Sequence, residues 1–204
     1  MPGPLPPTVV YLHGFRSSPS SVKASALSAA VAALPPAVRP RLHVPALDFA
    51  PGEAVAGVLA WVCANVPDPG ASLTFVGSSL GGFYATHLAE RLGARAALVN
   101  PAIRPFDDLA QYAGPQTNLY TGATFVVTAA HFAELRALAV PRISRPARYF
   151  LLVQSGDELL DWREAVAYYG GAFQHVEGGG DHAFQRFERT IPAILRFAHV
   201  RAVA

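Results

Sequence analysis

The sequence predicts an α/β fold, with a mostly parallel, doubly wound sheet and helices on both faces. Short apolar runs alternate with longer segments of helical pattern along the 204 residues. Strands that are apolar throughout are typical of a parallel sheet whose two faces are both covered. Hydrophobic residues make up 51% of the chain and charged residues only 15%, against about 25% in an average domain. The chain can therefore bury a large core, and its composition excludes a disordered protein.

The expected elements alternate in order along the chain. The predicted strands are short apolar runs bounded by turn residues or proline: 8–12, 41–44, 72–76, 96–99, 149–153 and 173–176. The predicted helices carry apolar residues at helical spacing: 20–34, 53–65, 83–92, 161–169 and 184–199. Ser20 or Ser21 is a suitable N-cap for the first helix, Gly93 ends the third, and Asp161 is placed to cap the fourth.

We expect residues 1–204 to form one domain, because the chain contains no internal repeat, low-complexity linker or break in composition. The segment 104–145 departs from the alternation of strands and helices. It carries five aromatic residues together with turn residues such as Gly114 and Pro115. We expect a cap-like insertion over the carboxyl edge of the sheet, where open α/β folds bind their ligands. The alternative is a surface excursion without a function.

Charge, cysteine content and hydropathy exclude several classes of protein. A net charge of +2 is too small for a surface that binds nucleic acid or an anionic membrane. The single cysteine, Cys63, excludes an intrachain disulfide and a thiolate metal cluster, and its apolar neighbours predict that it is buried. Residues 1–7 lack the profile of a signal peptide, and the weakly polar run 24–38 is too short to span a bilayer. We expect a soluble cytoplasmic protein.

Motifs for metals and nucleotides are also missing from the sequence. It contains no H-E-x-x-H pattern, and its run of three glycines at 178–180 lacks the Lys-Ser/Thr of a phosphate-binding loop. We therefore expect no metal and no cofactor.

A small-residue pentapeptide lies at a predicted junction between strand and helix. Residues 77–81, GSSLG, directly follow the strand ending at Val76 and directly precede a helical pattern. In such a sharp turn a serine hydroxyl is pushed outward, and the flanking residues must be small because the backbone crowds itself. The N-terminus of the following helix also favours developing negative charge. The central position makes Ser79 the candidate nucleophile, with Ser78 as the alternative.

A serine hydroxyl needs a base to take its proton, and the base needs a carboxylate to orient it. In hydrolases of this architecture the order along the chain is serine, acid, histidine, with the last two on loops after later strands. Asp157 follows the strand 149–153, and His182 follows the strand 173–176 and its glycine run. These positions make Asp157 the candidate acid and His182 the candidate base.

Other residues are alternatives for both roles. Glu158 and Asp161 lie close to the candidate acid, although Asp161 is also placed to begin a helix. His87 lies in the helix after the pentapeptide, and His175 lies inside a predicted strand. Asp181 is expected to be a solvated neighbour of the candidate base. The histidines that follow no suitable junction are those at 43, 131 and 199.

Backbone amides are the candidate donors to a developing oxyanion. The first predicted strand ends in His13-Gly14-Phe15, a turn of the type that presents a backbone N–H toward the serine. Phe15 is the expected donor there, and Leu80, the residue after the nucleophile, supplies the second N–H.

Four positions filled in the expected order predict a serine hydrolase that cleaves carboxylic esters through an acyl-enzyme. The expected partner is its substrate, a small-molecule ester or thioester. The alternative within enzymes is a thioesterase that would use the same triad on acyl-CoA or acyl-protein. Arg104, just past a strand end, could then bind an acidic group, although a surface arginine is the simpler interpretation. Further alternatives are a ligand-binding protein without turnover and an interaction module that uses the segment 104–145.

Several motifs resemble those of the α/β-hydrolase superfamily and, in finer detail, those of the small bacterial YqiA/YcfP-type esterases. They are spread over nearly the whole chain: YLHGF at 11–15, GSSLGGFYA at 77–85, NPAIRP at 100–105, YTG at 120–122, GDELLD at 156–161, AVAYY at 165–169 and GGDHAF at 179–184. The resemblance implies a compact, cofactor-independent esterase acting on short-chain or acyl esters. It also implies that Ser79, Asp157 and His182 form the catalytic triad.

The sequence departs from that family in two respects. The family's histidine is usually preceded by asparagine, whereas here Asp181 precedes it. At 204 residues the chain is also shorter than a full superfamily sheet requires. We therefore expect one or both antiparallel edge strands to be missing.

Overall fold

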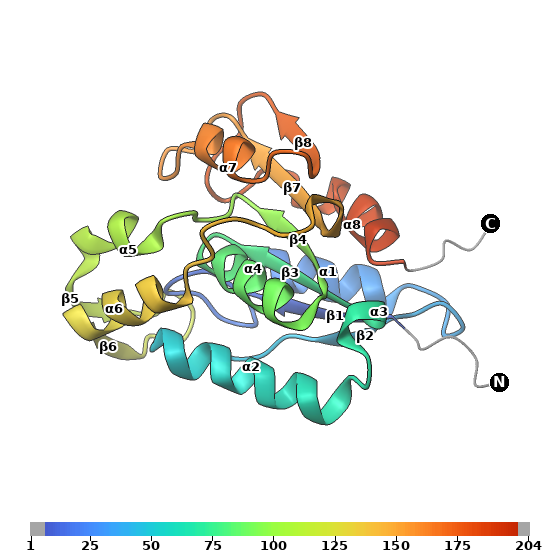
Figure 1. Ribbon diagram of the computed structural model, residues 1–204, viewed down its shortest axis with the longest axis horizontal. Helices are drawn as coiled ribbons and strands as arrows, with labels where there is room; N and C mark the ends of the chain where they lie inside the picture. Colours follow the sequence, from blue (N-terminus) through green and yellow to red (C-terminus); the bar gives the residue numbers. More distant parts are fainter. Residues whose placement is uncertain (1–6, 200–204) are drawn as a thin grey trace.

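The computed structural model describes residues 7–199, which form a six-stranded sheet with helices on both faces (Figure 1). The order across the sheet is β2, β1, β3, β4, β7, β8, and every neighbouring pair is parallel. The strands are β1 Thr8–Leu12, β2 Arg41–His43, β3 Leu73–Ser78, β4 Arg95–Val99, β7 Tyr149–Gln154 and β8 Phe173–Glu177. The predicted parallel, doubly wound fold is confirmed, and within residues 7–199 no antiparallel edge strand joins this sheet.

The register of the central strands brings their carboxyl ends to one edge of the sheet. Leu12 at the end of β1 pairs with Gly77 of β3, and Ser78 at the end of β3 pairs with Val99 at the end of β4. The last residues of β7 and β8 pair with each other in the same way. The loops that carry the candidate residues therefore all leave from this edge.

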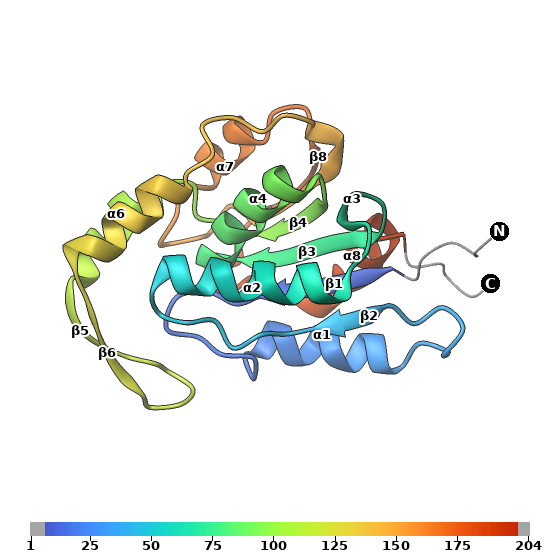
Figure 2. The same cartoon turned by 60° about the horizontal axis from the view of Figure 1, so that its bottom comes forward.

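Each face of the sheet is covered by its own helices (Figure 2). These are α1 Val22–Ala32, α2 Pro51–Asn65, α4 Leu80–Leu92, α7 Trp162–Tyr168 and α8 Ile191–Phe197. Alternate residues of a strand point to opposite faces, so Val9 and Tyr11 pack with α1 and α8, while Val10 and Leu12 pack with α2, α4 and α7. None of the helices in residues 7–199 has the length and apolar character needed to cross a bilayer.

Short elements connect the main ones. They are α3 Pro69–Ser72 before β3, and two 3-10 turns, η2 Pro146–Arg148 before β7 and η3 Phe187–Arg189 before α8.

Up to residue 138 the segment 104–145 lies beyond the carboxyl edge of the sheet, at the left in Figures 1 and 2; its last residues lead back along α4, where the Ser144 amide donates to Glu90 Oε1 at 3.1 Å. It contains α5 Pro105–Asp108, the 3-10 turn η1 Ala110–Tyr112, the antiparallel hairpin of β5 Gly114–Thr117 and β6 Thr124–Val127, and α6 Ala129–Leu138. The hairpin contacts the loop after β1: the Leu119 amide donates to the Arg16 carbonyl at 2.9 Å, and Asn118 Nδ2 donates to the Ser17 carbonyl at 2.7 Å. We propose that the segment is a cap-like insertion within a single domain.

The closing helix predicted at 184–199 is wrong in its first part, because α8 begins at Ile191. Phe184 and Arg186 have φ values of 61° and 60°, which helical residues do not adopt. Pro192 lies in the first turn of α8, where the missing N–H of a proline needs no partner. The helical spacing of the sequence therefore extends further than the helix itself.

The prediction that Cys63 is buried is also wrong. In α2 the buried side chains include Val55, Val58 and Val62, which share the face toward the sheet. Successive helical residues are about 100° apart around the axis, so the residue after Val62 turns away from that face. Cys63 is exposed.

His87 links α4 to the end of α6. Its Nδ1 lies 2.9 Å from the Leu138 carbonyl oxygen, so Nδ1 carries the hydrogen and Nε2 is a bare acceptor. Nε2 is buried, and it has no hydrogen-bond partner in residues 7–199. Burial lowers the pKa of His87, while the hydrogen bond to Leu138 opposes this and the Arg91 guanidinium adds to it.

We expect His87 to contribute to a loss of stability at acid pH. The unfolded chain has an ordinary histidine pKa of about 6.5, so it binds the proton first, and the free energy of unfolding falls as the pH drops below that value. His87→Gln, which keeps a donor for Leu138, should lose less stability than the wild type between about pH 7.5 and about pH 5.5 in urea unfolding. His175→Gln, at an exposed position of β8, is the control and should follow the wild type. Equal slopes for His87→Gln and the wild type would contradict this account.

Candidate active site

Ser79 lies in a strained turn between β3 and α4. Its φ of 54° and ψ of −122° lie outside the regions that ordinary residues adopt. Backbone hydrogen bonds hold the turn: the Ser79 amide donates to the Val99 carbonyl at 3.0 Å, and the Ser79 carbonyl accepts from the amides of Gly82 and Ala102 at 2.9 and 3.1 Å. The strand, the helix and the neighbouring strand end thus fix the position of the serine together.

Two glycines make this turn possible. A Cβ at Gly77 would lie 2.3 Å from the Gly81 carbonyl oxygen, and a Cβ at Gly81 would lie 2.1 Å from the Leu12 carbonyl oxygen. The obstructing atoms belong to the backbone, so no side-chain rotation can relieve the overlap. The small residues of the GSSLG pentapeptide are therefore a steric requirement of the turn.

The imidazole of His182 lies between the hydroxyl of Ser79 and the carboxylate of Asp157. His182 Nε2 is 3.0 Å from Ser79 Oγ, and His182 Nδ1 is 2.9 and 3.0 Å from the two oxygens of Asp157. A carboxylate accepts hydrogen bonds, so Nδ1 carries the hydrogen and Nε2 is free to accept the hydroxyl proton. The structure thus brings together the three residues that the sequence predicted, from loops after β3, β7 and β8.

The carboxylate of Asp157 is itself held in place. Its side chain is only 2% exposed. Besides His182, its Oδ1 accepts hydrogen bonds from the amides of Leu159 and Leu160, both at 3.0 Å. These amides fix the direction of the carboxylate, and Asp157 in turn orients the imidazole.

The loop after β1 passes close to Ser79. A Cβ at Gly14 would lie 3.3 Å from Ser79 Cβ. His13 fixes this loop, because its Nε2 accepts from the Leu47 amide at 3.3 Å and its Nδ1 lies 3.1 Å from the Gly14 carbonyl oxygen. Burial lowers the pKa of His13, more than its bond to Gly14 raises it, which favours the neutral ring. Within residues 7–199, the Phe15 and Leu80 amides donate to no other group, so both are available to an oxyanion.

Gln154, the last residue of β7, is a positioning residue that the sequence reasoning missed. Its side chain is fully buried. Its Oε1 accepts from the amides of Asp181 and Gln185 at 3.3 and 2.8 Å. Its Nε2 donates to the Gln185 carbonyl at 2.9 Å and to Glu177 Oε2 at 3.1 Å. One amide side chain thus braces the loop that carries His182 on both sides of the histidine.

Asn100 performs a similar task after β4. Its Nδ2 donates to the carbonyls of Asp181 and His182 at 3.0 and 3.2 Å, and its Oδ1 accepts from the Gln154 amide at 3.0 Å. A polar side chain directly after an apolar strand is the signal that could have identified Asn100. Gln154 occupies the corresponding place at the end of its own strand.

The alternative candidates lie elsewhere or have other contacts. Glu158 Oε2 accepts from the backbone amide of His182 at 2.9 Å, so it supports the histidine without reaching the ring. Asp161 caps α7 by accepting from the Arg163 amide. Asp181 Oδ2 accepts from Gln185 Nε2 at 2.9 Å. Arg104 is a surface residue that pairs with Asp107.

None of the alternative histidines contacts Ser79. His43 stacks on Trp61, and His131 belongs to the capping box of α6. The others are on α4, on β8 and at the end of α8: His87, His175 and His199. Ser78, the alternative nucleophile, is a buried residue of β3.

Lys23 ties α1 to the histidine loop. Its Nζ donates to the Ala183 carbonyl at 2.7 Å. Burial lowers the pKa of the Lys23 ammonium, and the carboxylates of Asp181 and Asp157 oppose this shift. Lys23 is the single lysine of the chain, and it places a positive charge beside the acid and the loop of the candidate base.

Two cavities flank the loop 14–17. The first, of about 540 Å³, contains Ser79 and His182, and its rim carries the exposed apolar side chains Val22, Leu119, Tyr120 and Leu159. The second, of about 370 Å³, is lined by Phe15 and Leu80 together with residues of the 47–49 loop and the hairpin, and Phe15 lines the first cavity as well. Each cavity is large enough to hold one portion of a small molecule that lies across the loop 14–17.

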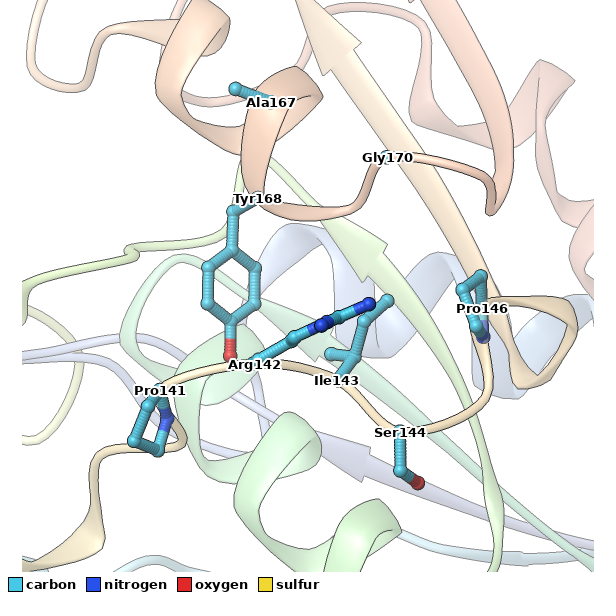
Figure 3. Close-up of a pocket in the computed structure, with 8 residues that line it drawn as sticks. All are labelled: Pro141, Arg142, Ile143, Ser144, Pro146, Ala167, Tyr168 and Gly170. Atoms are coloured by element: carbon cyan, nitrogen blue, oxygen red, sulfur yellow. The ribbon is translucent and has the colours of Figure 1, made fainter.

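A third cavity, of about 580 Å³, lies away from Ser79, between the 141–146 segment and the end of α7 (Figure 3). Tyr168 points across it toward the 141–146 segment, and its hydroxyl donates to the Val140 carbonyl at 2.6 Å. Residues 7–199 contain no group of three or more histidine, cysteine or acidic side chains placed to hold a metal ion.

A protein-family model described as Uncharacterised protein family (UPF0227) matches residues 8–199. Similar solved structures include one from Agrobacterium vitis S4, with a TM-score of 0.72 and 18% identity over 95% of this chain and 88% of that chain. Mouse alpha/beta hydrolase domain-containing protein 10 has a TM-score of 0.67 and 15% identity over 96% and 92%. The esterase domain of a Rhodothermus marinus protein has a TM-score of 0.66 and 16% identity over 97% and 89%. These likenesses confirm the α/β-hydrolase fold that the sequence motifs implied.

We expect the steric requirement at Gly81 to be measurable. Gly81→Ala places a Cβ against the Leu12 carbonyl and should destabilise the fold by about 1–3 kcal/mol or prevent it from forming. Gly57→Ala is the matched control, because a Cβ there has nothing within 4 Å and lies in the helix α2. It should stabilise the protein by about 0.5–1 kcal/mol. Urea unfolding measures both, and a neutral Gly81→Ala would contradict the crowding described.

Gln154 offers a second test. Gln154→Met leaves the part-buried amides of Asp181 and Gln185 without their acceptor and should lower the free energy of unfolding by about 1–3 kcal/mol. Gln111→Met, at an exposed position where Nε2 reaches only the Asp108 carbonyl, should change the free energy of unfolding by less than about 0.5 kcal/mol. Similar values for the two variants would show that Gln154 does not brace the loop.

Proposed function

This chain belongs to the UPF0227 family, whose model matches it from residue 8 to residue 199, and on that premise we propose that it is a serine esterase that hydrolyses carboxylic esters. The observation that carries the proposal is the contact chain from Ser79 Oγ through His182 to Asp157, at 3.0 and 2.9 Å. The Rhodothermus marinus relative described as an esterase domain supports the same class of substrate.

The first half of the proposed reaction forms an acyl-enzyme. His182 Nε2 takes the hydroxyl proton of Ser79 while Oγ attacks the ester carbonyl carbon. The carbonyl oxygen becomes an oxyanion and accepts hydrogen bonds from the Phe15 and Leu80 amides. The tetrahedral intermediate then collapses, the bond to the alcohol oxygen breaks, and His182 returns the proton to that oxygen. The alcohol leaves, and the acyl group remains bonded to Ser79.

The second half repeats these steps with water. His182 takes a proton from a water molecule, whose oxygen attacks the acyl carbon, and the same amides hold the second oxyanion. Collapse releases the carboxylic acid, and the proton on His182 returns to Ser79 Oγ. Throughout, Asp157 keeps the hydrogen on Nδ1 and stabilises the imidazolium that forms transiently.

The strained turn and the amides are suited to these roles. Each oxyanion donor contributes about 3–4 kcal/mol of transition-state stabilisation in comparable sites. Both donors here are backbone amides that are fixed before substrate arrives, one at the start of α4 and one in the loop braced by His13. The helix N-terminus behind Leu80 adds a favourable partial positive charge.

We expect Ser79→Ala to lower the hydrolysis of p-nitrophenyl butyrate by about 10⁴-fold or more, because the attacking atom is removed. Ser78→Ala, one residue earlier, is the matched control and should retain most of the activity. A fluorophosphonate probe should label the wild type and Ser78→Ala but not Ser79→Ala. Labelling or turnover by Ser79→Ala would refute the assignment, and a wild type that neither reacts with the probe nor hydrolyses the ester would refute the function.

A further inference from the structure

The geometry assigns the two cavities beside Ser79 to different halves of an ester, given the proposed function. The leaving alcohol oxygen must be reached by His182 Nε2, because that nitrogen returns the proton. His182 lines the cavity of about 540 Å³, which therefore receives the alcohol half. The carbonyl oxygen lies between the Phe15 and Leu80 amides; Phe15 lines both cavities, whereas Leu80 lines the cavity of about 370 Å³ and not the first. The acyl group extends into this second cavity.

The walls of the acyl cavity are aromatic. Phe15 meets Phe125 edge-on, with ring centroids 5.9 Å apart at 87°, and Phe125 stacks on Phe49 at 5.1 Å and 26°. Phe49 is 50% exposed, so the water-facing part of the cavity has an aromatic ring available for contact. Rings arranged in stacked and edge-on pairs offer matching surfaces to a further flat ring.

The side chain of Tyr84 lies at the wall of the same cavity. Tyr84 is one turn of α4 beyond Leu80, about 6 Å along the helix axis, and is 3% exposed. The hydroxyl forms no hydrogen bond within residues 7–199 and is not one of the buried polar atoms there, so it is open to the cavity that Tyr84 lines. A hydroxyl without a protein partner can pair with a polar group of a ligand. Burial raises the pKa of Tyr84, and the carboxylates of Glu134 and Asp48 add to this, so the hydroxyl stays neutral and can donate or accept.

We propose that this cavity selects aromatic acyl groups that carry a ring hydroxyl, with Tyr84 as the specificity-determining hydrogen-bond partner. The substrate class is thus esters of hydroxybenzoic or hydroxycinnamic acids. The aromatic walls bind the ring, and the Tyr84 hydroxyl pairs with the ring hydroxyl when the carbonyl lies at the Phe15 and Leu80 amides. Asp48 lies on the same cavity wall, and its carboxylate can accept the hydrogen of the ring hydroxyl when the Tyr84 hydroxyl donates to the ring hydroxyl's oxygen.

The test compares pairs of methyl esters that differ only in the ring hydroxyl: 4-hydroxybenzoate with benzoate, and 4-hydroxycinnamate with cinnamate. In the wild type, kcat/KM should be about five- to tenfold higher for the hydroxylated ester of at least one pair, which is the factor that one neutral hydrogen bond contributes. In Tyr84→Phe that ratio should fall to about 1, because the partner is removed. Tyr168→Phe is the matched control: Tyr168 lies at the distant cavity of Figure 3, so this variant should keep the wild-type ratio.

The outcomes separate this inference from the function on which it rests. Equal kcat/KM within both pairs, or a hydroxyl preference that survives in Tyr84→Phe, would overturn the role of Tyr84. A wild type that prefers methyl hexanoate to all four aromatic esters would overturn the aromatic class. In each of these cases, hydrolysis of p-nitrophenyl butyrate that depends on Ser79 would leave the esterase function standing. Absence of that hydrolysis would instead refute the esterase function.

Discussion

The crowded backbone around Ser79 is the constraint on which the rest of the site depends. A residue other than glycine at φ 54° costs on the order of 1–3 kcal/mol, and such a conformation persists only where the surroundings leave no alternative. Here the Val99 carbonyl, the Gly82 and Ala102 amides, and the absence of side chains at two glycines supply those surroundings. The parallel register of β1, β3 and β4 then determines which loops can reach the serine.

Two buried amide side chains connect this rigid turn to the more irregular loops. Asn100 follows β4, and Gln154 ends β7, at the positions where the sheet stops supplying backbone partners. Asn100 uses its carbonyl oxygen on the end of β7 and its NH₂ group on the loop of His182, and Gln154 uses both groups on that loop, so together they hold the loop against the sheet. The distance of 3.0 Å between His182 and Ser79 therefore follows from the packing of polar groups that take no part in the proposed reaction.

The sequence was sufficient for the strands and for the order of Ser79, Asp157 and His182, because apolar runs and small-residue turns depend on local chemistry. It was insufficient for features that depend on distant partners. The β5–β6 hairpin carries no alternation of polar and apolar residues strong enough to predict two strands. The closing helix begins only at Ile191, because Phe184 and Arg186 before it adopt positive φ values. Whether Cys63 is buried depended on the orientation of α2, which a run of apolar residues cannot give. The acyl cavity combines residues from four separate segments.

The hairpin has a consequence for how this site can change during evolution. The Leu119 amide and the Asn118 side chain donate to the carbonyls of Arg16 and Ser17, next to Phe15, whose amide is a proposed oxyanion donor. The hairpin also lines the proposed acyl cavity. One segment thus shapes that cavity and holds the loop of a proposed oxyanion donor, so we expect drift in the hairpin to alter turnover and selectivity together. We therefore expect any remodelling of this segment to preserve its two hydrogen bonds to the Arg16 and Ser17 carbonyls.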